Sequence, residues 1–145
     1  MVNNAVPIEQ VGAVRIDQAF IGSCANGSLD DLAEAARVVL GHRIAPGVRF
    51  IVTPASANIY REALRAGYVQ MLTDAGATVT PATCGACFGG HLGVLGPGET
   101  CITASTRNFQ GRMGDPTARI YMASPATVAA SAIAGRIVHP GEVQA

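Results

Sequence analysis

The chain has 145 residues, of which 49% are hydrophobic and 14% are charged, and its ten basic residues balance its ten acidic ones. A chain of this length is expected to form one domain, residues 1–145, with irregular ends over 1–15 and 139–145. Zero net charge and the lack of a basic run argue against binding to nucleic acid or an anionic membrane. No apolar run approaches the ~20 residues of a transmembrane helix, and the first residues do not resemble a signal peptide. We therefore expect a cytoplasmic protein.

Apolar periodicity and turn residues predict strands that alternate with helices. Ser28 is expected to cap a helix, with Asp31 completing a capping-box contact. Ser124 followed by Pro125 is a typical helix start. The expected strands span residues 17–21, 48–52, 77–80, 100–104 and 119–122, and the expected helices span 29–40, 57–66, 68–75 and 126–134.

This alternation predicts the α/β class. We expect a three-layer α/β/α fold with a mainly parallel sheet of four to five strands and helices on both faces. In such folds, ligands bind outside the carboxyl ends of the strands. Residues that could bind a ligand follow several of these predicted ends, namely Cys24, Cys84, Cys87 and Arg107. Their shared placement predicts a binding site at this edge.

Cys84 and Cys87 form a C-x-x-C motif within a glycine-rich segment, residues 82–91. This motif occurs in redox dithiols, in zinc sites and in iron–sulfur sites. A third cysteine, Cys24, is also flanked by small residues. A redox dithiol needs no third cysteine, and a structural zinc site requires four ligands. His91 could be that fourth ligand, so zinc stays open as an alternative.

Three thiolates suit a [4Fe–4S] cluster, because they leave one iron free to bind water or substrate oxygens as a Lewis acid. Small residues beside the ligands allow backbone N–H groups to approach the cluster sulfurs. Cys101 lies inside a predicted strand and is expected to be a core thiol. The plainer alternative is that all the cysteines are buried apolar side chains, the usual environment of free cysteine.

The polar loop over residues 105–116 contains Arg107 and Arg112. Two guanidinium groups in a glycine-containing loop can bind carboxylates in a bidentate manner. The alternative is that both are ordinary solvated arginines. Placement beside the predicted cysteine site favours anion binding.

Four blocks of the sequence resemble the aconitase superfamily, and within it the large subunits of 3-isopropylmalate dehydratases. Residues 21–27 are similar to the family pattern I-G-S-C-T-N-G, and residues 83–91 to T-C-G-P-C-x-G-G-H. Residues 105–114 are similar to S-N-R-N-F-x-G-R-M-G, and residues 123–126 match A-S-P-A. The blocks occur in the family's order, and the resemblance covers residues 3–140.

The resemblance implies roles for these residues. Cys24, Cys84 and Cys87 would ligate the [4Fe–4S] cluster, and Asn26 would also contribute to cofactor binding. The substrate-binding residues would be Arg107, Arg112, Asn108 and Thr106, the last standing where many relatives have Asn. The implied reaction is dehydration and rehydration of 3-isopropylmalate or a related di- or tricarboxylic hydroxy acid, as in leucine biosynthesis.

In this family, the matching segment is the third domain of a longer large subunit. The resemblance therefore implies two kinds of protein partner, the remaining large-subunit domains and a small subunit that carries a swivelling domain. We identify no catalytic acid or base in the chain and expect it to be inactive when isolated. The alternative is a stand-alone, non-catalytic module that binds zinc or an iron–sulfur cluster.

Overall fold

The computed structural model describes residues 4–143 and contains a five-stranded parallel sheet with the strand order β3-β2-β1-β4-β5. The strands are β1 (Gln18–Gly22), β2 (Arg49–Thr53), β3 (Thr78–Val79), β4 (Thr100–Thr103) and β5 (Arg119–Met122), and the helices are α1 (Leu29–Val39), α2 (Ala57–Arg65), α3 (Tyr68–Ala75) and α4 (Pro125–Ala134). The α/β class and the parallel sheet are confirmed.

Local sequence signals set the ends of the helices. The Ser28 hydroxyl accepts a hydrogen bond from the Asp31 N–H at 3.2 Å, and the Asp31 carboxylate accepts one from the Ser28 N–H at 3.0 Å. This is the capping box that the sequence predicts for α1. At α4, Ser124 caps the helix and Pro125 occupies its first turn. These contacts satisfy N–H groups that have no partner within the helix.

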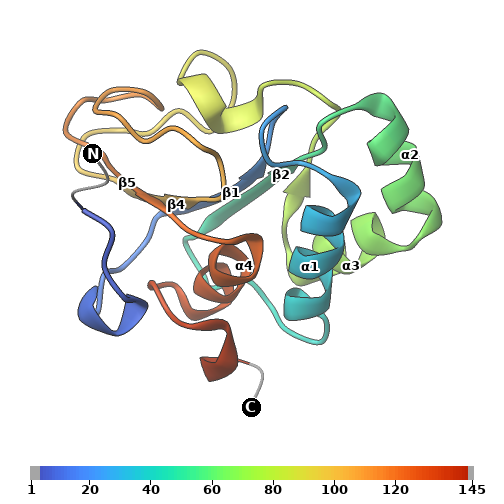
Figure 1. The fold of residues 1–145 in the computed structure, drawn as a ribbon, viewed down its shortest axis with the longest axis horizontal. Coiled ribbons are helices and arrows are strands. Elements are labelled where there is room, and N and C mark those ends of the chain that lie inside the picture. Colours follow the sequence, from blue (N-terminus) through green and yellow to red (C-terminus); the bar gives the residue numbers. More distant parts are fainter. Residues whose placement is uncertain (1–3, 144–145) are drawn as a thin grey trace.

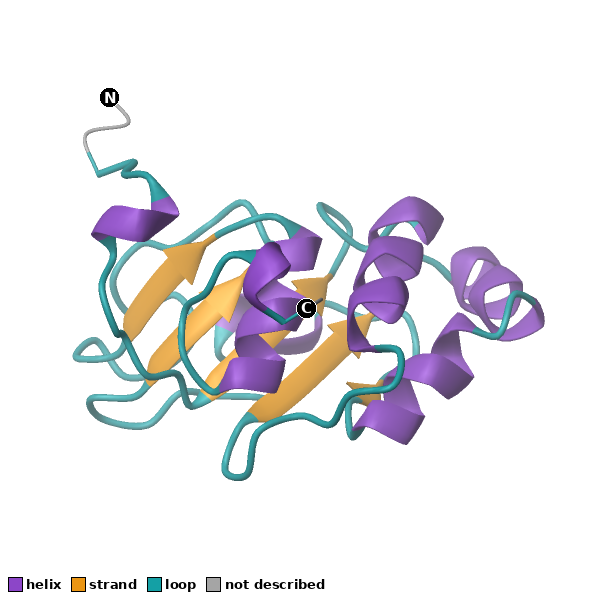
Figure 2. Ribbon diagram, turned by 90° about the horizontal axis from the view of Figure 1, so that it is seen from below, coloured by secondary structure: helices purple, strands orange, loops and turns teal. Residues whose placement is uncertain are grey.

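The order of the strands decides which face of the sheet each connection covers. The chain runs from β1 through β2 to β3 in one direction and then from β3 over to β4 and β5 in the other. Right-handed crossovers therefore place the first two connections on one face and the later two on the other. Helices α1, α3 and α4 lie together on the first face, with α2 packed against α1 and α3 (Figure 1; Figure 2).

The other face is covered by loops, in contrast to the α-helices expected on both faces. The β3–β4 connection forms only a short 3-10 helix, η2 (Gly85–Phe88), and the β4–β5 connection forms none (Figure 1). Glycine recurs along the first of these connections, and an α-helix there would lose backbone entropy at each glycine. The third layer of the fold is therefore a layer of loops, called here the loop layer and comprising residues 81–98 and 105–117.

Side chains alternate between the two faces along each strand. In β1, Ala19 and Ile21 belong to the large core beneath the helices, whereas Phe20 belongs to a smaller core beneath the loop layer. All five residues of β1 are buried. The central strand is thus covered on both faces, as is typical of parallel sheets.

Both ends of the chain carry short 3-10 helices, η1 (Ile8–Gln10) and η3 (Pro140–Glu142), in segments for which the sequence predicts no regular structure. The predicted irregular ends also include residues 1–3 and 144–145, which lie outside the described residues. Among residues 4–143, no helix has the length and apolar character needed to cross a bilayer.

Candidate functional site

Cys24 lies in a tight turn directly after β1. Gly22 has φ +133°, and a Cβ atom there would lie 2.0 Å from the Thr53 carbonyl oxygen. Ser23 has φ +68° and is, among the described residues, the only non-glycine residue with a positive φ. Its N–H donates to the Thr53 carbonyl at 3.1 Å. The turn is therefore bound to the end of β2, and it leaves the Cys24 side chain exposed.

The Cys84 and Cys87 segment is bound to the same strand end. The Oγ1 atoms of Thr53 and Thr80 lie 2.8 Å apart in a hydrogen bond. A Cβ atom at Gly85 would lie 2.5 Å from the Thr53 Oγ1, so only glycine fits there. Thr53 thus contacts both cysteine-bearing segments, one through its carbonyl and the other through its side chain. The sequence alone does not single out Thr53, whose only signal is its position at the end of a predicted strand.

The four thiols differ in their exposure. Cys24 and Cys84 are exposed, Cys87 is half-buried and Cys101 is buried in the smaller core. Burial raises the pKa of the Cys101 thiol to about 12, so it stays protonated and unreactive at neutral pH. The prediction that Cys101 is a core thiol is confirmed.

The loops that carry the three site cysteines both contact Thr53, but their thiols do not form a single-ion site. Within residues 4–143, no three His, Cys, Asp or Glu side chains are placed so that they could hold one metal ion. His91, the fourth ligand in the zinc interpretation, is exposed.

Asn26 has unused hydrogen-bonding capacity close to Cys24. Its side-chain oxygen is the only buried side-chain N or O atom among the described residues that lacks a hydrogen-bond partner. A buried, unpaired polar atom costs about 1–3 kcal/mol. Such atoms are uncommon in native proteins and indicate that a water molecule, an ion or a ligand completes the site.

The residues expected to bind substrate lie after β4. Ser105 is buried, and its N–H donates to the Thr103 Oγ1 at 3.0 Å. The chain then emerges, and Thr106, Arg107 and Asn108 are exposed. The Asn108 amide donates to the Ile120 carbonyl at 3.4 Å.

Arg112 turns back from this loop towards Cys87. Its Nε donates to the Cys87 carbonyl at 2.8 Å, and its Nη2 lies 3.7 Å from the Cys87 sulfur. Its guanidinium carbon lies 5.4 Å from the centre of the Phe109 ring, within the range of a cation–π contact. The structure therefore brings Arg112 and Cys87 together, although 25 residues separate them in sequence.

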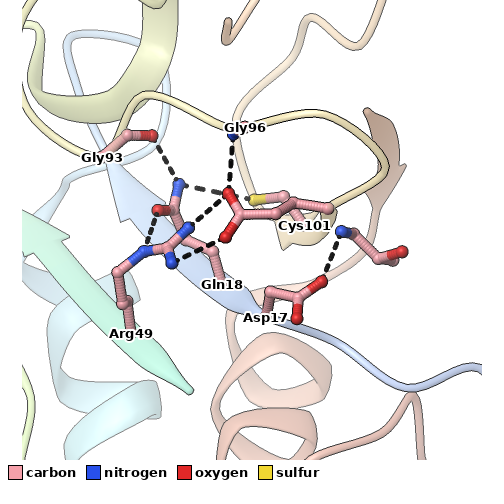
Figure 3. Close-up of polar contacts among 8 residues, drawn as sticks. Asp17, Gln18, Arg49, Gly93, Gly96 and Cys101 are labelled. Carbon is pink, nitrogen blue, oxygen red and sulfur yellow. Dashed lines mark hydrogen bonds and ion pairs between the residues drawn. The ribbon is translucent and has the colours of Figure 1, made fainter. Parts of the chain in front are cut away.

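A polar network holds the loop layer at the opposite end of the sheet (Figure 3). The Gln18 side chain is fully buried, donates to the Gly93 carbonyl at 2.9 Å and accepts from Arg49 Nε at 3.1 Å. Arg49 also forms two hydrogen bonds with Glu99, at 2.9 and 2.8 Å. The Arg49 contact is the main cause that lowers the Glu99 pKa, and a hydrogen bond from the Gly96 N–H contributes.

Strand order places the two groups of site residues beside each other. β1 and β4 are adjacent, and the connections that leave them run in opposite directions across the sheet. Their carboxyl ends therefore form the topological switch point, where open parallel sheets bind ligands. Cys24 follows β1, and the Arg107 loop follows β4.

The chain is a parallel α/β domain, and thiols and guanidinium groups are the candidate binding groups at this edge of its sheet. The chain belongs to the aconitase family, because the model of that family, described as aconitate hydratase, matches residues 2–135.

Several curated relatives are similar to nearly the whole chain. The 3-isopropylmalate dehydratase large subunit of Mycolicibacterium smegmatis is 63% identical over 142 residues, which cover 98% of this chain and 34% of that protein. The corresponding subunit of Sulfurihydrogenibium sp. is 50% identical over 97% of this chain and 33% of its own length. The homoaconitase large subunit of Thermus thermophilus is 50% identical over 99% of this chain and 34% of its own length. The chain thus spans about a third of the length of these relatives.

Proposed function

We propose that this chain is the iron–sulfur cluster-binding domain of a hydro-lyase that acts on 3-isopropylmalate in leucine biosynthesis. The observation that carries the proposal is the meeting of the Cys24 and Cys84/Cys87 segments at the end of β2, with Arg112 against Cys87. Membership of the aconitase family supports it. Relatives named 3-isopropylmalate dehydratase large subunit, one of them 63% identical, favour this substrate.

In this proposal Cys24, Cys84 and Cys87 hold a [4Fe–4S] cluster. A cluster needs its ligating sulfurs further apart than a single ion does, because each thiolate binds a different iron. In this proposal the thiols come from two segments, with Cys24 after β1 and with Cys84 and Cys87 in the β3–β4 connection. The unpaired amide oxygen of Asn26, two residues after Cys24, provides a polar contact beside the cofactor or its bound substrate.

When bound, the cluster would supply a Lewis-acidic iron to the hydroxyl group of the substrate. The chain itself supplies anion recognition. Within the described residues, the Arg107 side chain has no ion-pair partner and is exposed at the switch point, so it can bind a substrate carboxylate. Thr106 and Asn108 flank it in the sequence and are also exposed, and in this proposal they contribute to substrate binding. In this proposal Arg112 also contributes positive charge there.

The rest of the active site lies outside this chain in the proposal. Relatives are about three times as long as the segment they share with it. We propose that the remaining large-subunit domains and a small swivelling-domain subunit supply the acid and base that move the substrate protons. The complete enzyme would work in the cytoplasm on a soluble hydroxy acid.

Anaerobic reconstitution with iron and sulfide tests the cofactor assignment. We expect the broad visible absorption of a thiolate-bound cluster in the wild-type chain and its loss in Cys24→Ala and Cys87→Ala. Cys101→Ala is the matched control, because it removes a buried thiol outside the site and should leave the absorption unchanged.

A colourless protein that holds stoichiometric zinc through His91 and the cysteines would contradict the proposal and favour a non-catalytic metal-binding module. Activity is tested separately, by adding the remaining domains and the small subunit to the reconstituted chain. Turnover of 3-isopropylmalate only in the complete mixture is the expected result, and turnover by the chain alone would contradict the division of roles.

A further inference from the structure

Arg112 and Arg107 belong to the same loop but differ in their exposure and in their contacts. Arg107 is exposed and forms no hydrogen bond or ion pair with the described residues, whereas Arg112 is half-buried and directed to Cys87. From this difference we infer that Arg112, beyond the charge it contributes, is a positioning residue for the Cys84/Cys87 segment, a role that Arg107 does not share. The inference rests on the proposed function in one respect, namely that Cys87 is a cluster ligand.

The donor geometry of the guanidinium group supports this assignment. Arginine binds a carboxylate best through two parallel N–H groups on one edge. In Arg112 the edge formed by Nε and Nη2 is used, because Nε donates to the Cys87 carbonyl at 2.8 Å and Nη2 faces the Cys87 sulfur at 3.7 Å. The Phe109 ring, 5.4 Å from the guanidinium carbon, contacts the group as well.

The Cys87 backbone needs such a contact because its own segment provides little regular structure. The η2 helix has four residues, and the Cys87 N–H bonds to the Cys84 carbonyl at 3.1 Å. Arg112 adds a charge-assisted hydrogen bond to the carbonyl of the same residue. Arg112 therefore fixes one proposed ligand relative to the β4–β5 loop.

The β3–β4 and β4–β5 connections also contact each other close to Arg112. A Cβ atom at Gly89 would lie 2.6 Å from the Gly114 nitrogen, so the two backbones touch next to Arg112. Further along, the Leu95 N–H donates to the Met113 carbonyl at 2.8 Å, and the Asp115 N–H donates to the Leu95 carbonyl at 2.9 Å. Hydrogen bonds thus join the two loops on both sides of Gly114, and Arg112 adds a further contact at Cys87.

The test compares hydrogen–deuterium exchange of the full cluster-free chain in Arg112→Gln, Arg112→Lys and Arg107→Gln. We expect exchange across residues 84–90 to become about tenfold faster in Arg112→Gln, the change that corresponds to losing one charge-assisted hydrogen bond. Arg112→Lys, which can still donate to the Cys87 carbonyl, should recover part of the protection. Arg107→Gln removes the same charge from the same loop and should exchange like the wild type.

A second readout follows the reconstituted cluster. Its visible absorption should disappear faster in the presence of a chelator in Arg112→Gln than in Arg107→Gln, with Arg112→Lys between them. Equal exchange over residues 84–90 in wild type and Arg112→Gln would overturn the inference, and so would an equal effect of Arg107→Gln. If the wild type binds no cluster but the exchange pattern holds, the proposed cofactor fails while the positioning role of Arg112 stands.

Discussion

At the scale of single residues, the site depends on how closely backbone segments approach one another. Gly22 and Gly85 both contact Thr53, and at each of them a Cβ atom would lie 2.5 Å or less from an oxygen of that residue. The glycines flanking the cysteines therefore have a steric role in addition to any contact with a cofactor. The sequence indicates that small residues surround the cysteines, but not which atom requires them to be small.

Gly22→Ala should lower the free energy of unfolding by about 3 kcal/mol or more, because it combines a backbone overlap with an unfavourable φ of +133°. Gly41→Ala is the matched control. Gly41 also has a positive φ, +78°, but a Cβ atom there would have no other atom within 4 Å, so we expect a loss of only about 1 kcal/mol. Urea unfolding of both variants measures the difference. Equal losses would show that the contact with Thr53 carries no energetic weight.

Residue roles that involve distant partners cannot be found from the sequence. The place of Arg112 in a polar loop predicts that it binds substrate, yet its contacts in the structure are with Cys87 and Phe109. The buried position of Cys101, by contrast, is predicted correctly, because its apolar strand context is local.

At the scale of elements, capping and periodicity locate the helices, whereas the loop layer is held by side chains from the strands. Gln18 aligns with Arg49 on one side and with Cys101 on the other, so the three side chains form a row on the same face of the sheet. That row contacts the loop layer directly at Gly93, and Arg49 also binds Glu99, which accepts a hydrogen bond from the Gly96 N–H of that layer. In the sequence, the only sign of this row is a glutamine, Gln18, at the start of an apolar strand.

Gln18→Leu should lower the free energy of unfolding by about 1–3 kcal/mol, because it leaves the Gly93 carbonyl and the Arg49 Nε without their buried partner. The same substitution at Gln70 is the control. Gln70 is exposed on α3 and donates to Asp74, and surface changes of this kind are usually within about 0.5 kcal/mol of neutral. The midpoint of urea unfolding reports both. Wild-type stability in Gln18→Leu would contradict this role.

At the scale of the whole molecule, two hydrophobic cores pack against opposite faces of one sheet. The larger lies beneath the helices, and the smaller, which includes Phe20 and Cys101, lies beneath the loop layer. Because β1 contributes to both, the loss of either core exposes one face of this central strand and weakens the support for the other core. We therefore expect the described residues to unfold as one cooperative unit, as a single domain of this length should.

Cys101 allows this to be measured. Its thiol is buried and its pKa is raised to about 12, so an alkylating reagent should modify it only after the smaller core opens. Across a urea titration, labelling of Cys101 should follow the loss of helical circular dichroism. Cys24 and Cys84, which are exposed, should be labelled throughout and serve as internal controls. Labelling of Cys101 before any loss of helix would indicate that the loop layer unfolds independently.

The sequence by itself determined the α-helices and strands, their caps and the α/β class, because each depends on neighbours within a few positions. Only the tertiary structure decided that α-helices cover one face and loops the other, because strand order, and not local periodicity, sets the side to which each crossover passes. It likewise decided that Thr53 joins the two cysteine segments and that Arg112 contacts Cys87. Those contacts form between residues far apart in the chain, which only the assembled fold brings together.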